Sequence, residues 1–281
     1  LAAGSEAAGL ISAGAYAHLF RDRAAFAGDG VAFGLKAAQG LTWTERPAAE
    51  IDPALSPAYG FAAVMPDHGW IADPGAYVAA LARAVAAAGG RIVAAEVRDI
   101  RPGPEGVDVA TDAGPLRAER VVLAAGVWSR GLAARVGLRV PLESERGYHL
   151  MLHGPSHRPP HPVMLADRAL VVTPMRAGLR VAGAVEFGGL DAPPSAAPLA
   201  LIRRAVRRAW PHLTWEDETA WMGHRPTATD SLPVIGRVPG APAVILASGG
   251  QHLGLTIGPR LGRIAADLAA DRPSGLDLAP Y

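Results

Sequence analysis

The clearest periodic pattern of hydrophobic residues lies at residues 72–90, ADPGAYVAALARAVAAAGG. Apolar side chains recur there at the three- and four-residue spacing of one buried stripe on a helix: Val78, Leu81, Ala82 and Val85. Asp73 can cap the first turn, and Pro74 suits the first helical position. Gly89 or Gly90 can supply the left-handed residue after the last turn. We therefore predict a helix over this stretch.

Two uninterrupted apolar runs predict strands that are buried on both faces, as the strands of a parallel sheet are. They are residues 121–125 (VVLAA) and residues 243–250 (AVILASGG). With a strand predicted at residues 91–97, they indicate one largely parallel sheet. That sheet should contain Val93, Leu123 and Ile245.

The segments around these runs complete an α/β pattern. Residues 106–126 read as a hairpin that turns at Asp112-Ala113-Gly114 and is followed by the apolar strand at residues 121–125, and residues 259–271 (PRLGRIAADLAAD) read as a helix after the turn QHLGLT. Helix, strand, hairpin, buried strand and final strand–turn–helix, in this order, predict part of a doubly wound α/β domain.

The pattern changes to alternation between about residues 140 and 221, where GYHLML, ALVVTPM and LRVAGAVEF predict half-buried strands. Leu150, Val172 and Val181 should share this second, mostly antiparallel sheet, which a polar helix at residues 199–210 interrupts. The predicted fold class is therefore α/β (α+β), with two interleaved domains. Residues 66–139 and 238–281 form the doubly wound one, and residues 1–65 and 140–237 form the sheet-rich one inserted into it.

Composition and charge narrow the function. Half of the 281 residues are hydrophobic, which gives ample material for a core, and the net charge is +1 with basic residues scattered singly. A nucleic-acid binder would cluster them, so we predict no nucleic-acid partner. The densest basic stretch is RRAVRRAW at residues 203–210, interpreted as the solvated face of a helix or, alternatively, as a contact for anionic lipid.

Several kinds of chemistry are excluded or disfavoured. The chain has no cysteine, so it has neither disulfides nor thiolate sites, and no GxSxG motif indicates a hydrolase. His153, His157 and His161 are spaced by four, but the prolines and the glycine between them rule out the helix that would align them, so we predict no metal site. No run approaches the roughly 18 apolar residues of a membrane-spanning helix.

Residues 248–262 (SGGQHLGLTIGPRLG) form the most informative local motif. Its glycines permit close approach of the backbone to a ligand, and the N-terminus of the following helix would favour a phosphate, a carboxylate or the electron-rich edge of a reduced flavin. A turn without any ligand is the alternative. The dinucleotide fingerprint GxGxxG occurs nowhere, which by itself argues against autonomous binding of NAD or FAD.

Arg225 stands in a stretch with few other charges, MGHRPTATDSLPVIGR. Pro226 favours an extended backbone at Arg225. The arginine is then either a solvated surface residue or the anion clamp of a buried site.

Four stretches, in this order, resemble the FAD-dependent amine and amino-acid oxidoreductases of the D-amino-acid dehydrogenase, glycine oxidase and sarcosine oxidase group. They are residues 66–84, 121–152, 221–237 and 247–268. Taken as a whole, the sequence most resembles bacterial D-amino-acid dehydrogenases. Members of this group begin with the Gly-rich FAD motif, so the resemblance implies an N-terminally truncated chain whose FAD-binding domain, residues 66–139 and 238–281, lacks its first βαβ unit.

The resemblance also implies site residues. Arg225 matches the arginine that pairs with the substrate carboxylate, and Tyr148 lies where relatives place a residue that faces the ligand. His252 stands where glycine oxidase has a second carboxylate-binding arginine, and it completes the candidate catalytic set within expected reach of Arg225. The candidate cofactor-binding residues are Val97, Ala125, Gly126, Gly223, Gly249, Gly250, Gln251, His252, Leu253, Gly254, Leu255 and Thr256.

The implied activity is oxidative deamination of a D-amino acid or another small amine acid. Hydride would pass from Cα to N5 of FAD, and the imino acid would hydrolyse to a 2-keto acid. Electrons would then go to a membrane quinone chain or to O₂, in a cytoplasmic protein or one peripheral on the inner membrane. A glycine- or sarcosine-type oxidase is the alternative within this class, and a truncated, non-enzymatic remnant without flavin is the alternative outside it.

Overall fold

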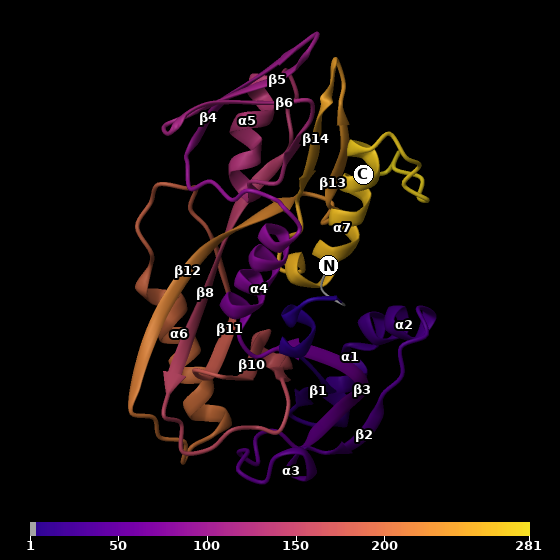
Figure 1. Ribbon diagram of the computed structural model, residues 1–281. Coiled ribbons are helices and arrows are strands. Elements are labelled where there is room, and N and C mark those ends of the chain that lie inside the picture. Colours follow the sequence, from indigo (N-terminus) through magenta and orange to yellow (C-terminus); the bar gives the residue numbers. More distant parts are fainter. Residues whose placement is uncertain (1–3) are drawn as a thin grey trace. The chain divides into compact units, whose positions relative to one another are not determined.

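The computed structural model describes residues 4–281, and its elements are labelled in Figure 1. The chain divides into two compact units. The first unit comprises Leu1–Arg91, Gly147–Val185 and Pro193–Met222, and the second comprises Ile92–Arg146, Glu186–Ala192 and Gly223–Tyr281. Each unit therefore consists of segments that are far apart in the sequence.

An eight-stranded sheet, in the order β12-β8-β11-β10-β9-β1-β3-β2, makes up much of the first unit, although the first residues of β8, up to Arg146, and the last residues of β12, from Gly223, belong to the second unit. Its strands are β1 (Ile11–Phe20), β2 (Thr44–Pro47), β3 (Phe61–Ile71), β8 (Leu142–His153), β9 (Val163–Leu165), β10 (Leu170–Met175), β11 (Gly178–Phe187) and β12 (Asp217–Ala228). The ladders β1–β3, β2–β3, β9–β10 and β10–β11 are antiparallel, whereas β1–β9 is parallel. Leu150, Val172 and Val181 lie in this mostly antiparallel sheet, so that prediction is confirmed.

The main core of the first unit lies against α6 (Ala196–Ala209). This helix confirms the one predicted at residues 199–210. It buries Ile202, Ala205, Val206 and Ala209, while Arg204, Arg207 and Arg208 are exposed. The basic stretch is therefore a solvated helix face, as its first interpretation has it. Figure 1 shows the short helices α1 (Arg23–Gly28), α2 (Gly30–Ala38) and α3 (Ala48–Ile51) near β1, β2 and β3.

Helix α4 (Pro74–Ala87) confirms the helix predicted at residues 72–90, and Asp73 caps it by accepting a hydrogen bond of 2.9 Å from the backbone N–H of Ala76. The predicted buried stripe is wrong in part, because Val78 and Val85 are exposed. The helix instead packs through Tyr77 and Ala80 against the 3-10 helix η2 (Glu6–Leu10), a contact that the sequence periodicity does not reveal.

The second unit contains two three-stranded sheets. One has the order β4-β5-β6, with strands β4 (Val97–Gly103), β5 (Gly106–Thr111) and β6 (Gly114–Ala118), and it includes the predicted hairpin. The other has the order β13-β14-β7, with strands β13 (Val234–Val238), β14 (Ala241–Ser248) and β7 (Val121–Leu123). Strand β14 pairs in parallel with β7 and antiparallel with β13.

The prediction for the parallel sheet holds for Leu123 and Ile245 and is wrong for Val93. Residues 91–96 form no strand, and the antiparallel ladder of β4 with β5 begins only at the pair Val97 and Thr111. Strand β7 is an edge strand of its sheet, so Val122 is 43% exposed and burial on both faces is wrong there. Val244, Ile245 and Leu246 of β14 are buried, as predicted.

Helices α5 (Ser129–Arg135) and α7 (Gly254–Ala269) pack on the sheet of β14 and β7. Helix α7 begins at Gly254, so the predicted start at Pro259 is wrong. The backbone N–H groups of Thr256 and Ile257 already donate to the carbonyl of Leu253. Pro259 lies inside the helix and leaves the carbonyl of Leu255 without its helical donor.

An aromatic cluster beside β1 surrounds His18, which is 9% exposed. The His18 ring contacts those of Tyr16, Phe20 and Phe33 at centroid distances of 5.0, 6.4 and 5.4 Å. Burial, with smaller contributions from the charges of Lys36 and His68, lowers the pKa of His18 from 6.5 to about 4. The imidazole is therefore neutral in the folded protein at neutral pH.

Acid should destabilise the first unit through His18. The unfolded chain takes up this proton near pH 6.5 and the folded chain near pH 4, so the stabilisation is complete above pH 6.5 and is lost as the pH falls to 4. The loss should reach at most about 3 kcal/mol. His18→Phe should flatten the pH dependence of the unfolding free energy in denaturant, although His149, whose pKa is also lowered to about 4, keeps part of it. The same slope in His18→Phe and in the control His212→Phe, at an exposed histidine, would contradict this.

Gly249→Ala should lower the melting temperature. Gly249 follows β14 with φ +81°, and a Cβ there would lie 3.1 Å from the backbone N of Val234 and 3.2 Å from Cα of Pro233. The left-handed conformation alone should cost roughly 1–2 kcal/mol. The control Gly262→Ala adds a methyl group to α7 in open space and should stabilise by about 0.5–1 kcal/mol. Thermal unfolding followed by circular dichroism measures both melting temperatures. A Gly249→Ala protein as stable as the control would contradict this prediction.

Candidate functional site

Arg225 lies in β12 and makes an ion pair inside the second unit. Its Nη1 donates to Oε1 of Glu145, on the neighbouring strand β8, over 2.7 Å. The two side chains are only 21% and 16% exposed. Thr227, two residues further along β12, donates through its hydroxyl to Oε2 of the same carboxylate at 3.2 Å. The reading of Arg225 as a solvated surface residue is therefore wrong.

The alternation of a strand explains which residues share this face. Arg225 and Thr227 are two positions apart, so both point to the side of β12 that holds Glu145. Gly223, a candidate cofactor residue, has the same parity and is buried. His224 has the opposite parity. Its Nδ1 lies 2.7 Å from the hydroxyl of Ser144, and its ring lies 5.7 Å from that of Trp128.

The loop that joins β14 to α7 is attached to β12 directly after Arg225. The backbone N–H of Gln251 donates to the carbonyl of Pro226 at 3.2 Å, and the Gln251 side chain donates to the carbonyl of Ala228 at 3.4 Å. Gln251 adopts φ +46° there. The structure thus brings the loop candidates next to the strand that carries Arg225.

His252 to Thr256 are exposed in this loop and at the start of α7. Within residues 4–281, no hydrogen bond or ion pair joins His252 to Arg225, so their mutual reach stays a prediction. Gly249, Gly250, Gln251 and Leu253 line one side of a hollow of about 350 Å³, whose other side is formed by α7 and the C-terminal segment.

The other cofactor candidates lie along a groove of about 800 Å³ between β4, β7 and α5. Val97 and Ala125 both line it, with Trp128 and Leu132 as apolar neighbours and charged side chains from Glu96, Arg98 and Arg135. Gly126, next to Ala125, has φ +59°, and its carbonyl accepts a hydrogen bond of 2.8 Å from the hydroxyl of Ser248. Since Ser248 directly precedes the Gly249 loop, this bond connects the groove to the loop.

These features fit part of an FAD molecule. The groove has the volume and apolar lining of a cofactor site, and α7 directs its N-terminal N–H groups towards the exposed loop. A Gly-rich turn of the GxGxxG type, which would hold the pyrophosphate, is not among the 281 residues. The site residues present thus suit the adenine end and one edge of the flavin.

Tyr148 differs from the other candidates, because its side chain lies in the main core of the first unit and is 1% exposed. Its hydroxyl accepts a hydrogen bond of 2.9 Å from the backbone N–H of Ser195. Tyr148 alternates in register with the buried Leu150 and Leu152, and this period of two was the signal for a core position. The expectation that it faces a ligand finds no support in this packing.

The opposite face of β8 carries residues that the sequence analysis missed. His149 stacks on Trp221 of β12 at 5.0 Å, and its Nδ1 lies 3.4 Å from Nη2 of Arg180. Burial and the charge of Arg180 lower the pKa of His149 to about 4. Glu145 was missed as well, although its alternation with the buried Ser144 and Arg146 marks it as pointing to the other side of the strand.

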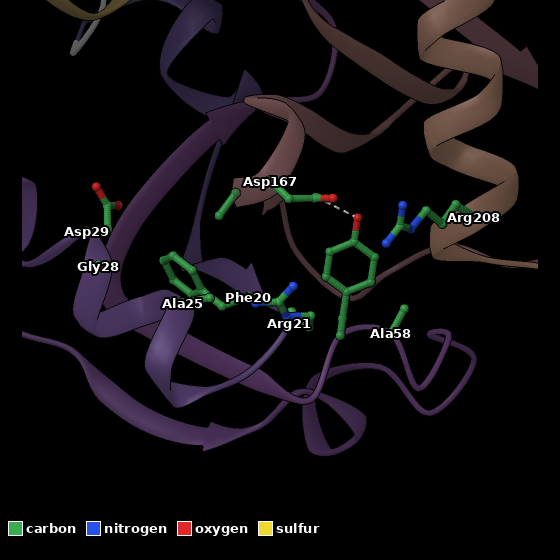
Figure 2. A pocket seen from close by; sticks show the side chains of 10 residues that line it. Phe20, Arg21, Ala25, Gly28, Asp29, Ala58, Asp167 and Arg208 are labelled. Carbon is green, nitrogen blue, oxygen red and sulfur yellow. Dashed lines mark hydrogen bonds between the residues drawn. The ribbon is translucent and has the colours of Figure 1, made fainter.

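A separate hollow of about 400 Å³ lies in the first unit and contains none of the candidate residues (Figure 2). Arg21, Asp29, Asp167 and Arg208 line it, together with Phe20. The Tyr59 hydroxyl donates to Oδ1 of Asp167 at 2.8 Å, and burial, followed by this bond, raises the pKa of Tyr59. Tyr59 is therefore held as a proton donor in this hollow.

Among residues 4–281, no group of three or more His, Cys, Asp or Glu side chains is arranged to hold a metal ion. In the same residues, no helix has the length and apolar character needed to cross a membrane.

Comparison with known proteins agrees with this geometry. The chain matches the family model "FAD dependent oxidoreductase" (DAO) over residues 5–268. It is 36% identical over 280 residues to a D-amino-acid oxidase of Bradyrhizobium diazoefficiens, which covers 97% of this chain and 66% of the relative. A D-amino acid dehydrogenase of Paramagnetospirillum magneticum is 35% identical over 173 residues, which is 60% of this chain and 41% of the relative.

Among solved structures, glycine oxidase from Geobacillus kaustophilus superimposes with a TM-score of 0.87 at 26% identity, covering 97% of this chain and 75% of that one. This likeness confirms the predicted mixed α/β fold class. The chain spans about two thirds or less of the two curated relatives. The match over residues 5–268 and the 36% identity nevertheless establish, as the motifs led us to expect, that this chain belongs to the DAO family of FAD-dependent oxidoreductases.

Proposed function

We propose that the chain takes part in the flavin-dependent oxidative deamination of a small amino acid, a D-amino acid in the first instance, and that Arg225 binds the substrate carboxylate. The observation that carries this proposal is the attachment of the Gly249–Thr256 loop to β12 immediately after Arg225. A cationic, partly buried side chain thereby lies beside the loop that we assign to the flavin.

Arg225 has free capacity for an anion. A guanidinium has five N–H donors in a planar fork, and within the described residues Glu145 takes one of them, through Nη1. The remaining donors can form two parallel bonds to a carboxylate. Arg225 would then orient the substrate so that its Cα–H points at the cofactor.

Bound FAD would accept the hydride from Cα, a reaction that the protein supports by orientation and electrostatics. The groove at Val97 and Ala125 would hold the adenine end. Helix α7 has 16 residues, and its N–H groups near Leu255 and Thr256 would stabilise negative charge on the pyrimidine edge of the reduced flavin.

The electron acceptor is either O₂ or a quinone chain, since relatives are named both as oxidases and as dehydrogenases. Contact with anionic lipid would use the exposed arginines of α6, Arg204, Arg207 and Arg208. A second candidate function is a role of these 281 residues without flavin, since they hold no GxGxxG turn. A purified chain that is colourless, without a flavin spectrum, would support this alternative.

The isolated 281-residue chain should bind FAD weakly or not at all, because it holds no Gly-rich pyrophosphate turn. Equilibrium dialysis measures the binding. Val97→Arg in the groove should weaken any residual binding, whereas Val78→Arg, on the exposed side of α4, should leave it unchanged. Tight, stoichiometric FAD on the unmodified chain would show that the groove and loop suffice.

In a flavin-competent version of the protein, Arg225→Ala should raise KM for the amino acid about tenfold to more than a hundredfold. It removes a charge-assisted pair that contributes roughly 1.5–3 kcal/mol. Arg225→Lys keeps a charge opposite Glu145 but loses the planar fork, so it should recover only part of the affinity. Steady-state kinetics, with melting temperatures to verify folding, measures both. Unchanged turnover in Arg225→Ala combined with loss of activity in His252→Ala would assign the carboxylate to His252 instead.

A further inference from the structure

Both oxygens of the Glu145 carboxylate accept a hydrogen bond, but each has acceptor capacity left. Arg225 donates to Oε1 at 2.7 Å and Thr227 to Oε2 at 3.2 Å. An ionised carboxylate offers about four acceptor positions, so about half of them remain available. The side chain is partly buried, with 16% of its surface exposed.

The charges around Glu145 are arranged as a single dipole. Arg225 is the cation that faces it from β12. The neighbouring charged residues of β8 have partners of their own, because Glu143 pairs with Arg130 at 3.4 Å and Arg146 with Glu186 at 3.5 Å. The Arg225–Glu145 pair is thus locally neutral, with its positive and negative ends side by side.

This arrangement is complementary to a zwitterion. An α-amino acid carries its carboxylate and its ammonium group on the same carbon, so the two charges are also side by side. A ligand that carried only a carboxylate would find Glu145 repelling it next to Arg225. An α-amino acid would instead offer its ammonium group to Glu145 and its carboxylate to the free edge of Arg225.

We propose that Glu145 binds the substrate ammonium group and accepts its proton, so that Arg225 and Glu145 together select α-amino acids over acids without an amino group. This rests on the proposed function and deepens it. The Glu145 carboxylate takes H⁺ from R–CH(NH₃⁺)–COO⁻ and gives R–CH(NH₂)–COO⁻ and the carboxylic acid of Glu145. The neutral amine would then have the lone pair that hydride transfer from Cα to a bound flavin requires, and Glu145 would return its proton to water.

A purely structural role for Glu145 would require different chemical properties of its side chain than proton transfer does. A partly buried ion pair contributes little net stability, because desolvation offsets the attraction. Holding Arg225 in place requires only a hydrogen-bond acceptor, which a glutamine also provides. Accepting a proton at neutral pH requires the carboxylate. Glu145→Gln therefore separates the two roles.

The first test is a binding experiment on a flavin-loaded, flavin-competent version of the protein, using calorimetry with D-alanine and with propionate, which lacks the amino group. We expect the unmodified protein to bind D-alanine at least about tenfold more tightly than propionate, and Glu145→Gln to bring this ratio close to one. The control is Glu143→Gln, which makes the same change two residues away on β8 at another ion pair. It should leave the ratio unchanged.

The second test is the pH profile of kcat/KM. In Glu145→Gln the amine must lose its proton to solvent, so the profile should rise at higher pH, towards the pKa of the substrate's own ammonium group. At pH 7, kcat/KM should fall at least tenfold. Glu145→Asp should recover part of the rate, and Glu143→Gln should match the unmodified protein. A mere structural role would leave the profile in place.

The outcomes separate this inference from the proposed function. If the unmodified protein binds neither D-alanine nor propionate, the proposed function fails and the inference falls with it. If it binds D-alanine but the preference over propionate survives in Glu145→Gln, or the pH profile does not move, the proposed function stands and the role of Glu145 is refuted.

Discussion

Arg225 and Glu145 face each other from the adjacent strands β12 and β8 at 2.7 Å, and the candidate site is organised around this pair. The pair fixes which face of each strand is polar. Thr227 extends it along β12, and the loop after β14 attaches to the backbone of the next residue, Pro226. A charge inside the protein has to be paired. This part of the second unit therefore has to keep Arg225 and Glu145 in contact with each other.

A hydrogen bond at the end of β14 connects the loop to the groove. The hydroxyl of Ser248, at the end of β14, binds the carbonyl of Gly126, after β7. The ends of two parallel strands are thereby joined at the side where the groove and the loop lie, which is where ligands bind in open α/β sheets. Positions 125 and 249 are distant in the sequence, yet the parallel pairing of β7 with β14 makes them neighbours in the site.

The sequence alone was enough for the elements whose signals are local. The cap at Asp73, the hairpin at Asp112–Gly114 and the apolar run of β14 all predict what the structure contains. The sequence alone did not predict structure that depends on a distant partner. Residues 91–96, for example, form no strand, because no other strand within residues 4–281 pairs with them. In the site, Arg225 and the loop could be found from motifs, but Glu145 could not, since its importance comes from a strand 80 residues away.

Pro259 divides α7 into two parts of unequal local stability. Because its ring nitrogen carries no hydrogen, the carbonyl of Leu255 is not bound within the helix, and the first turn is attached to the remainder by one bond fewer. The later residues Ile264 and Ala265 are anchored in a core with Ile235 and Ile245. Local opening of residues 254–258 therefore costs less free energy than unfolding of the helix body. The segment next to the candidate site can rearrange around a ligand while the sheet beneath it keeps its structure.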